Sequence, residues 1–336
     1  MSCDFVGKYV IMAVVTAHHD AKQTHEMIEL HNATTLIDLS ARTLIRVTGA
    51  ESATFLQGQL TQDVGALEGS RALWAAHCSP KGRMLASFLM WQTDGQIWLD
   101  ASADLAEPAL RRLRMYVLRA KATLEDARTT VSRLGLCGPG IAAALKTAGC
   151  ADAPAPGTHD QQEGLTRVAL SAQRLLLAGP TAAISLLQAR LAPLCQPGTL
   201  QDWTAAAVRE GIAEITLATQ DEWIPQMLNW DLIGGVSFKK GCYTGQEIVA
   251  RTHYLGKVKR RLLRFRVAGH PEIGQELLHA GSPAGKVVLV GTASAQGSEL
   301  LAVIQLEAWA QGPLALGSPA GPLLELLPLP YPVALD

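Results

Sequence analysis

The amino-acid sequence predicts a mixed α+β protein with more than one domain. Its 336 residues are too many for one ordinary hydrophobic core. Strand-like and helix-like segments alternate up to about residue 256, and from Val258 onwards short strand-like runs separated by glycines replace them. This order predicts two α+β units followed by a small antiparallel barrel or sandwich.

The first α+β unit is predicted within residues 31–130. Its expected elements are a strand at 43–49, a helix at 50–60, strands at 71–78, 84–92 and 96–101, a helix at Ser102–Arg119 and a strand at 121–126. Ser102 can cap the long helix, and four arginines in its later turns suit a helix C-terminus. The order of strands and helices is similar to that of ferredoxin-like sheets, which carry their helices on one face.

The second α+β unit is predicted within residues 131–256, and a C-terminal β-barrel within 257–336. The expected elements of the second unit are a strand from Ser132, a helix at 141–149, strands at 166–171 and 174–178, and helices at 182–191, 202–210 and 245–255. In the tail, "LLRFRVAG", "AGKVVLVGTAS" and "LLAVIQLEAWA" predict strands without any helix. Residues 1–30 are interpreted as a leader outside these domains.

Composition indicates a soluble, globular protein of the cytoplasm. Hydrophobic residues make up 48% of the chain and the formal net charge is −1, so overall charge indicates no particular partner. The six cysteines lack metal-ligand spacing, which favours reduced thiols over a disulfide framework and predicts no metal site. The apolar run Tyr9–Ala17 is too short to span a bilayer and makes a poor secretory signal. The sequence contains no recognisable internal repeat.

The stretch "FKKGCYTGQEIVART" (238–252) gathers more reactive side chains than any other. "TGQE" fits a capping box, in which the Thr244 hydroxyl and the Glu247 carboxylate would each bond the other residue's backbone. The predicted helix would end at Leu255, before Gly256. Cys242 would then lie near the positive end of the helix, beside two lysines. Both features favour an accessible thiolate.

Structural explanations for the same residues remain open. A single cysteine is commonly a small buried hydrophobic residue, and capping alone accounts for Glu247. Arg251 lies four residues after Glu247, where it can form an ordinary ion pair on the helix surface. Lys239 and Lys240 can form a solvated strand end, of which at most one side chain faces the thiol.

A basic run at 257–266 follows the stretch and has no acidic residue within it. Such a run is commonly a solvated face, but it can also attract RNA or the anionic tail of a small molecule. Aromatic residues are not interleaved with the charges, which disfavours direct binding of nucleic acid without excluding it. There is no Walker motif or GxGxxG fingerprint to support a nucleotide-binding enzyme.

Four segments carry a resemblance to a known family. "KGCYTGQEIVAR" (240–251) resembles the signature of the YgfZ family of folate-binding proteins, which is long and specific. "GAESATFLQGQLTQDV" (49–64), "AAHCSPKGRM" (75–84) and "IPQMLNWD" (224–231) are similar to other family segments and occur in family order. The resemblance runs from about Leu36 into the C-terminal domain and does not cover the leader.

The resemblance implies a fold, a ligand and partners. The family is related to the aminomethyltransferase T protein of glycine cleavage, which implies a three-domain, ring-like α+β molecule with a C-terminal antiparallel β-barrel. It also implies a central pocket for tetrahydrofolate or a derivative. Family members support maturation or repair of iron–sulfur enzymes and, through them, tRNA modification. Iron–sulfur enzymes or assembly proteins are therefore expected partners, and a monomer is the default expectation.

One departure from the transferase relatives argues against their reaction. Where they carry a catalytic aspartate, this chain has "KGRMLAS" (81–87), which places Leu85 or Ala86 at the position of the acid. Neither side chain can orient the reacting folate nitrogen or favour positive charge on it. We therefore expect folate binding without aminomethyl transfer, and whether the protein is an enzyme remains open.

The expected site combines the family signature with upstream residues. Gln59, Asp63 and Asn229 are candidate partners for the pterin edge, and Arg251 or the basic run for the glutamate tail. Cys242 is the candidate reactive thiol. The signature contributes four further candidate folate-binding residues, Lys240, Tyr243, Gln246 and Glu247. Two rival functions remain, a folate-dependent one-carbon transferase and an RNA-binding module that uses the basic run.

Overall fold

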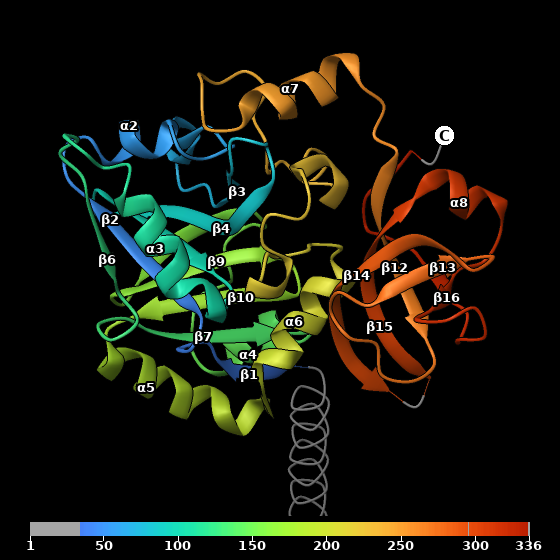
Figure 1. Ribbon diagram of the computed structural model, residues 1–336. Helices are drawn as coiled ribbons and strands as arrows, with labels where there is room; N and C mark the ends of the chain where they lie inside the picture. The colour runs from blue at the N-terminus through green and yellow to red at the C-terminus, as the bar shows by residue number, and fades with distance from the viewer. Residues whose placement is uncertain (1–33, 295, 335–336) are drawn as a thin grey trace, which may run out of the picture.

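The computed structural model describes residues 34–294 and 296–334 (Figure 1). The expected leader at 1–30 and Cys3 lie outside the described residues. The described chain forms three β-sheets with helices around them, so the predicted α+β class is confirmed. None of the described helices is both long and apolar enough to cross a membrane.

The first of these sheets, here the N-terminal sheet, is antiparallel, with strand order β3-β4-β5-β2-β6. Its strands are β2 (Thr43–Thr48), β3 (Leu73–Cys78), β4 (Met84–Thr93), β5 (Gln96–Ala101) and β6 (Thr123–Asp126). Helix α2 (Ser52–Gln57) connects β2 to β3, and α3 (Ala106–Arg114) connects β5 to β6. This is the predicted ferredoxin-like order of elements with one additional strand, β3, at the edge.

The second sheet, here the middle sheet, has the order β11-β1-β7-β10-β9-β8. Its strands are β1 (Thr35–Asp38), β7 (Ser132–Cys137), β8 (Thr158–Gln162), β9 (Leu165–Ser171), β10 (Arg174–Gly179) and β11 (Gln196–Gly198). Helices α4 (Ile141–Thr147) and α5 (Thr181–Leu191) make its two helical connections. Because β1 pairs with both β7 and β11, the chain enters this sheet before it builds the N-terminal sheet.

The two sheets repeat one topology. In each, the chain runs strand–helix–three strands–helix–strand, and the strands take corresponding places. The only difference in strand order is that β1 lies between β7 and β11 in the middle sheet. The repeat is one of element order and pairing, which explains why the sequence shows no recognisable repeat.

The two sheets pack face to face, with helices on their outer faces. One buried cluster joins Leu44 and Trp91 of the N-terminal sheet to Val168 and Leu176 of the middle sheet. The opposite face of the N-terminal sheet packs against α2 and α3, and that of the middle sheet packs against α4 and α5. Strand β4 is buried at nine of its ten positions because both of its faces are covered.

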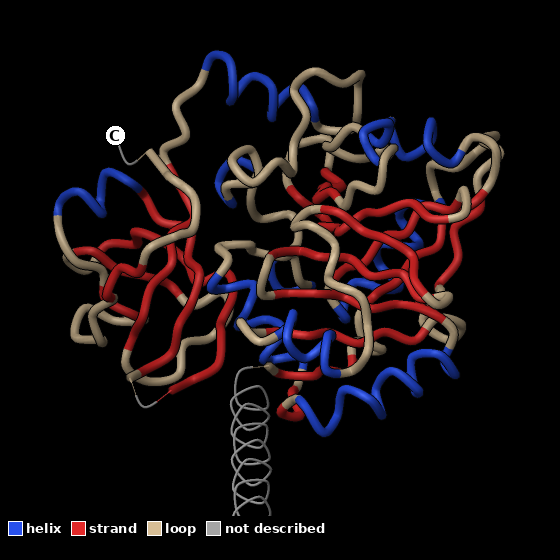
Figure 2. Tube along the Cα trace, turned by 180° about the vertical axis from the view of Figure 1, so that it is seen from behind, coloured by secondary structure: helices blue, strands red, loops and turns tan. Residues whose placement is uncertain are grey.

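The third sheet, here the C-terminal sheet, is antiparallel and has the order β16-β13-β14-β15-β12-β17. Its strands are β12 (Arg260–Val267), β13 (Glu276–His279), β14 (Ser282–Ser294), β15 (Gly297–Gln305), β16 (Ala315–Leu316) and β17 (Glu325–Leu327). It forms a half-barrel, and no ladder between its end strands β16 and β17 occurs within the described ranges. Figure 2 shows it beside the two stacked sheets, and helix α6 (Leu200–Arg209) packs against β14, β1 and β7.

Two expectations about helices are wrong. The helix expected at Ser102–Arg119 is α3 alone, preceded by a 3-10 turn at Ala103–Leu105, and Ser102 does not cap it. Beyond Arg114 the chain continues in tighter turns, in which the Tyr116 and Val117 N–H groups donate to Leu113 O and Arg114 O, and Leu118 takes a left-handed conformation with φ of 44°. In the tail, "LLAVIQLEAWA" is not wholly strand, because β15 is followed by α8 (Leu306–Gln311). The Trp309 ring of α8 packs edge-on against Phe265, which anchors this short helix to the sheet.

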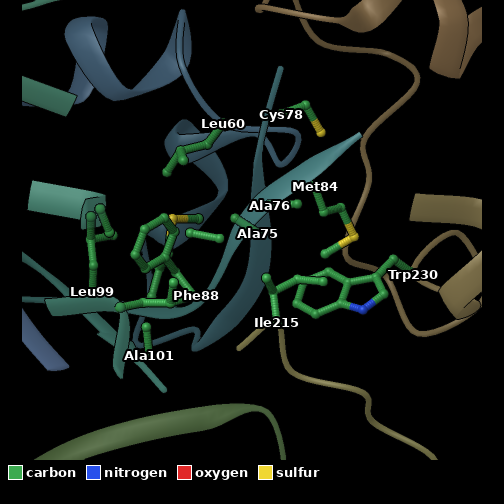
Figure 3. Close-up of a cluster of buried hydrophobic side chains, with 14 of the residues drawn as sticks. Leu60, Ala75, Ala76, Cys78, Met84, Phe88, Leu99, Ala101, Ile215 and Trp230 are labelled. Atoms are coloured by element: carbon green, nitrogen blue, oxygen red, sulfur yellow. The ribbon is translucent and has the colours of Figure 1, made fainter. Parts of the chain in front are cut away.

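The remaining described elements lie in connections within or between the sheets. They are α7 (Gln246–Leu255) and 3-10 helices at Val64–Leu67, Ala192–Leu194, Leu217–Thr219 and Pro225–Leu228. Side chains from the segment after α6 complete the core beneath the N-terminal sheet. Figure 3 shows Ile215 and Trp230 of this segment with Met84, Ala76 and other buried residues of β3 and β4.

Candidate functional site

A hollow of about 490 Å³ opens between the edges of the two stacked sheets. Apolar residues outnumber polar ones in its lining, while polar and apolar atoms contribute about equally to its surface. The lining residues are Gln62, Arg71, Ala72, Leu73, Trp74, Leu89, Pro156, Gly157, Thr158, Ala169, Leu170, Ile212, Ile233 and Gly234. They come from β3 and β4 of one sheet, β8 and β9 of the other, and several connecting segments.

Backbone hydrogen bonds hold the two sheet edges together beside the hollow. The Ala72 N–H donates to Gly157 O at 2.9 Å, and the His159 N–H donates to Ser70 O at 2.8 Å. The Gln62 side chain donates to the backbone oxygen of Gly234, which ties together two more lining residues. These contacts make the hollow a preformed feature of the stacked sheets.

Trp74 is the only aromatic side chain among the residues that line the hollow. It is half-buried, and its ring packs edge-on against Trp230 at 5.8 Å between centroids. On β10, the guanidinium carbon of Arg174 lies 6.0 Å from the Trp74 ring centroid and 4.9 Å from that of Trp203. Trp74 therefore presents a flat, supported surface to the hollow.

Lys240 anchors the loop that carries Cys242. Its ammonium nitrogen donates to the backbone oxygens of Gln57, Leu60 and Gln62 at 2.6, 2.5 and 3.2 Å. These acceptors lie at and just beyond the C-terminal end of α2, where a cation is favoured. The ammonium also lies 5.1 Å from the centroid of the Tyr243 ring. The loop is therefore tied to the 57–62 segment, whose last residue lines the hollow.

The environment of Lys240 is unusual for a lysine. The side chain is buried, and no carboxylate pairs with it within the described part of the chain. Desolvation lowers the pKa of Lys240 to about 8, against a smaller opposing effect of Asp63. Its hydrogen bonds show that it is committed to backbone carbonyls, so it does not form the solvated strand end considered from the sequence.

The capping box expected at Thr244 is wrong. Helix α7 begins at Gln246 with Gly245 as its N-cap, and no side chain caps it. Gly245 has φ of 84°, and a Cβ at this position would lie 2.3 Å from the backbone oxygen of Ser79. Gly245 therefore has a backbone conformation that glycine adopts readily, and the loop packs closely against the 79–82 turn between β3 and β4. Helix α7 ends at Leu255, before Gly256, as predicted.

The residues around the helix start differ in exposure. Cys242 is exposed, whereas Tyr243 is buried and its pKa is raised by desolvation and, to a smaller extent, by Cys78. Gln246 is half-buried. Glu247 and Arg251 are both exposed on α7, and the described chain contains no ion pair between them. The cysteine is thus accessible, as expected, while the side chains that flank it at 240 and 243 pack inward.

The candidate pterin partners are spread over different environments. Asp63 accepts hydrogen bonds from the Gly65 N–H at 3.1 Å and from the Gln57 side chain at 3.0 Å. Asn229 is fully buried in a left-handed conformation, and its amide nitrogen donates to Leu262 O at 2.8 Å. Gln59 is half-buried, and its side-chain oxygen has no partner among the described residues. Asp63 and Asn229 thus have local structural roles.

The structure divides the basic run into two parts. Arg261 forms a bidentate ion pair with Asp231 at 2.7 and 3.1 Å, and Arg264 and Arg266 pair with Glu299. The remaining cations, Lys257, Lys259 and Arg260, are exposed without a carboxylate partner in the described ranges and line a separate cleft of about 560 Å³. Half of the run is therefore neutralised within the C-terminal part of the molecule.

Comparisons with known proteins place this chain in a family. A family model described as the GCVT N-terminal domain matches residues 7–157. The tRNA-modifying protein YgfZ of Escherichia coli O157:H7 (strain EC4115 / EHEC) is 34% identical over 251 residues, 72% of this chain and 76% of that protein. The protein of the same name from strain O17:K52:H18 (UMN026 / ExPEC) matches equally. This chain belongs to the YgfZ family.

A solved structure supports the fold expected for a YgfZ-family protein. Glycine cleavage system aminomethyltransferase T from Bartonella henselae superposes with a TM-score of 0.72, over 90% of this chain and 87% of that one. At 17% identity, this likeness shows the fold alone. The T-protein-like α+β fold is thus confirmed, whereas the ring-like arrangement of three domains and their boundaries remain predictions.

The strand that would carry the transferase acid has no carboxylate in this YgfZ-family chain. Leu85, Ser87 and Leu89 alternate along one face of β4, and Leu89 lines the hollow. The Ser87 hydroxyl accepts the Ile215 N–H at 2.8 Å. This face of β4, where an acid would have to act, therefore carries two leucine side chains and a serine hydroxyl that already has a hydrogen-bond partner.

None of the nine site residues expected from the sequence lines the hollow of this family member. The structure brings Lys240, Tyr243 and Cys242 together on one loop, beside the 57–62 segment that contains Gln59. Arg251 and Asn229 lie elsewhere. Sequence reasoning missed Arg71 and Trp74. The feature of the sequence that could have pointed to Trp74 is that it is the single tryptophan in "RALWAAHC", a strand whose other side chains are mostly small.

Proposed function

We propose that this YgfZ-family protein binds tetrahydrofolate or a derivative and supports the maturation or repair of iron–sulfur enzymes. Through those enzymes it would act in tRNA modification in the cytoplasm, in keeping with the names of its relatives. The observation that carries the proposal is the preformed hollow between the two sheets, in a chain with a T-protein-like fold.

The hollow suits a folate in size and chemistry. Its volume of about 490 Å³ lies in the range of drug-sized ligands. The half-buried Trp74 ring offers a stacking surface for a flat pterin, and Gln62 and Thr158 offer polar groups for its edge. Arg71 is exposed and has no carboxylate partner within the described chain, so it can serve the anionic glutamate tail at the mouth.

The signature loop supports a functional thiol near this site. Cys242 is exposed on a loop that Lys240 ties to the Gln62 backbone, and Gln62 lines the hollow. A ligand that displaces Gln62 can therefore act on the loop that presents the thiol. We infer that Cys242 is the reactive centre through which the protein serves its iron–sulfur client, because its thiol is exposed.

Calorimetric titration tests folate binding. Purified protein is titrated with tetrahydrofolate and with folinic acid, and we expect saturable binding of at least one of them. Arg71→Ala should weaken binding about tenfold or more, because a charge-assisted contact to the tail is lost. Arg251→Ala is the matched comparison, since Arg251 is an exposed arginine away from the hollow. A larger effect of Arg251→Ala would indicate that the glutamate tail binds at α7 instead. Lack of binding by the unaltered protein would refute the proposal.

The one-carbon transferase rival makes a different prediction. It requires turnover of a methylene or formyl donor by the purified protein. We expect binding without turnover, because β4 places Leu85 or Ala86, and no carboxylate, at the position of the acid. Steady conversion of the donor would replace the present proposal with that of an enzyme.

Alkylation of the thiols tests the role of Cys242. We expect iodoacetamide to label Cys242 first among the cysteines of the described chain, because burial raises the pKa of Cys78 and Cys137 to about 12 and that of Cys195 to about 11. Peptide mapping assigns the label, and Cys242→Ser should remove the fast phase. Earlier labelling of another described cysteine would count against this role.

A further inference from the structure

Helix α7 exposes large apolar side chains where it ends. Leu255 is 84% exposed and Tyr254 is 65% exposed, and both belong to the last turn of the helix. Of the residues of α7, only Val249 is buried. Figure 1 shows α7 along the upper edge of the molecule, with no described element on its outer side. A contiguous apolar group on a surface indicates an interaction site, so the residues that adjoin this turn decide its meaning.

A cleft of about 560 Å³ adjoins the exposed turn. Its lining consists of Lys257, Val258, Lys259, Arg260, Gln305, Leu306, Glu307 and Ala310. The Leu306 N–H donates to Lys259 O at 3.0 Å, which joins the segment after α7 to the start of α8. Lys257 follows Leu255 by two residues, a length of chain that spans at most about 7 Å. Tyr254, Leu255 and the cleft lining therefore form one continuous surface, here the α7–α8 surface.

The free charge of the α7–α8 surface is positive. Lys257, Lys259 and Arg260 are exposed, and none of them has a carboxylate partner among the residues that the structure describes. The cleft lining contains one carboxylate, that of Glu307. The rest of the lining is mostly apolar, and the aliphatic stems of the two lysines extend this apolar area. The surface thus combines an apolar cleft with an excess of positive charge around it.

We propose that the α7–α8 surface binds an acidic segment of a partner protein that carries an aliphatic or aromatic anchor residue. The cations attract the carboxylates of the segment, and the apolar part of the cleft together with Leu255 buries the anchor. This interaction is independent of the proposed folate binding, because the α7–α8 surface and the hollow share no residue.

The combination of charge and shape favours a protein over other polyanions. RNA would use the cations, but its phosphates gain nothing from an exposed leucine, and Tyr254 is the one aromatic ring of the surface that a base can stack on. An anionic membrane would use both the cations and the leucine, but a flat lipid surface does not fill a cleft. An acidic peptide segment with an apolar side chain matches all three features.

Fluorescence anisotropy with labelled peptides tests this inference on the full chain. The probe is a short peptide rich in glutamate, with a central leucine or phenylalanine as its anchor. One counterpart carries serine in place of the anchor, and the other carries glutamine in place of every glutamate. We expect saturable binding of an anchored acidic peptide and an affinity about tenfold or more lower for each counterpart, because each loses one of the two attractions. Added salt should weaken the binding.

Two variants locate the binding site on the protein. Leu255→Ser removes the most exposed apolar side chain of the surface, and the double variant Lys257→Glu with Lys259→Glu reverses its charge. We expect each variant to weaken binding of the anchored peptide by about tenfold or more. The matched controls are Leu186→Ser on α5 and Lys146→Glu on α4, which are exposed residues of helices that pack on the middle sheet, away from α7 (Figure 1). Neither control should change the affinity.

Each result supports or overturns the inference. Absence of saturable binding by both anchored peptides would overturn it, and so would an affinity that neither Leu255→Ser nor the charge-reversal variant changes. Tighter binding of a single-stranded RNA oligonucleotide than of any peptide, lost on charge reversal, would assign the surface to RNA and overturn it as well. Cosedimentation with vesicles that contain phosphatidylserine, without peptide binding, would assign the surface to a membrane. None of these results changes the separate measurement of folate binding.

Discussion

At the scale of single residues, some side chains of the family signature are buried and hold its loop in place, while Cys242 is exposed. Lys240 and Tyr243 point inward and fasten the loop, whereas Cys242 between them stays accessible. The sequence presented these residues as one reactive group. Cys242 is exposed, whereas the Lys240 ammonium is held by three backbone carbonyls.

The buried position of Lys240 predicts a pH dependence of stability. Its pKa is about 8 in the folded protein against an ordinary 10.5, so between these values the unfolded chain binds more protons. The free energy of unfolding contributed by this group therefore rises as the pH increases from about 8 to 10.5, and is constant below about 7. Urea denaturation of the unaltered protein and of Lys240→Met over this range measures the difference.

The control for this experiment is the adjacent residue. Lys239 is exposed, so Lys239→Met should have the same pH profile as the unaltered protein. Parallel profiles for the unaltered protein and Lys240→Met would show that the ammonium is not desolvated. A stability difference that falls with rising pH would have the wrong sign for a lysine whose pKa is lowered by burial.

At the scale of elements, α7 depends on the turn against which it packs. Gly82 and Gly245 lie at this contact, and a Cβ at Gly82 would lie 2.9 Å from Cβ of Ile248 on α7. Farther along α7, the His253 ring stacks on Phe238 at 3.7 Å between centroids. These contacts hold both ends of the helix, which explains why it needs no side-chain cap.

Gly245→Ala is predicted to destabilise the protein more than an equivalent change in an open turn. The alanine would carry left-handed strain and a Cβ only 2.3 Å from Ser79 O. We expect the free energy of unfolding to fall by about 2–5 kcal/mol, the sum of strain and overpacking. Gly95 also has a positive φ, of 71°, but nothing lies within 4 Å of its added Cβ.

Gly95→Ala is therefore the matched control for that measurement. It should cost only the left-handed strain of about 1–2 kcal/mol. Thermal or urea unfolding of both variants gives the comparison. Equal losses of stability would mean that the contact between α7 and the 79–82 turn adjusts to the added methyl group without a cost in free energy.

At the scale of the whole molecule, a buried charge network joins the two repeated sheets. Asp100 of β5 accepts from Arg42 at 2.9 and 2.5 Å and from Arg133 of β7 at 2.9 Å. Arg42 also donates to Glu214 at 2.7 Å, which ties in the segment after α6. The carboxylates hold the pKa of Arg42 above its ordinary value despite burial. The network thus fixes how the sheets and this segment meet.

Removing the central carboxylate should be costly. Asp100→Asn would leave two buried guanidinium groups with one carboxylate between them, and we expect a loss of about 3–5 kcal/mol in the free energy of unfolding. Asp126→Asn removes the carboxylate of an exposed Asp–Arg pair and should cost about 1 kcal/mol or less. Urea denaturation at neutral pH compares them. A small effect of Asp100→Asn would show that the sheets do not depend on this network.

The local elements could be predicted because their causes are local. Strand alternation and helical periodicity located β2 to β5, α5 and α6 to within a few residues, and glycine placed the end of α7 correctly. The errors came where a distant contact decided the outcome. Gly245 is determined by the Ser79 oxygen, more than 160 residues earlier in the chain.

The sequence by itself determined the α+β class, the family and the exposure of Cys242. Periodicity and a continuous motif depend only on residues that are close together in the chain. Only the tertiary structure revealed that the two sheets repeat one topology, that the Lys240 side chain points inward, and that a hollow lies between the sheet edges. Trp74, which lines the hollow, meets Arg174 from the other sheet, a hundred residues away in the chain. Such a meeting depends on how two sheets stack, and no local pattern of side chains encodes it.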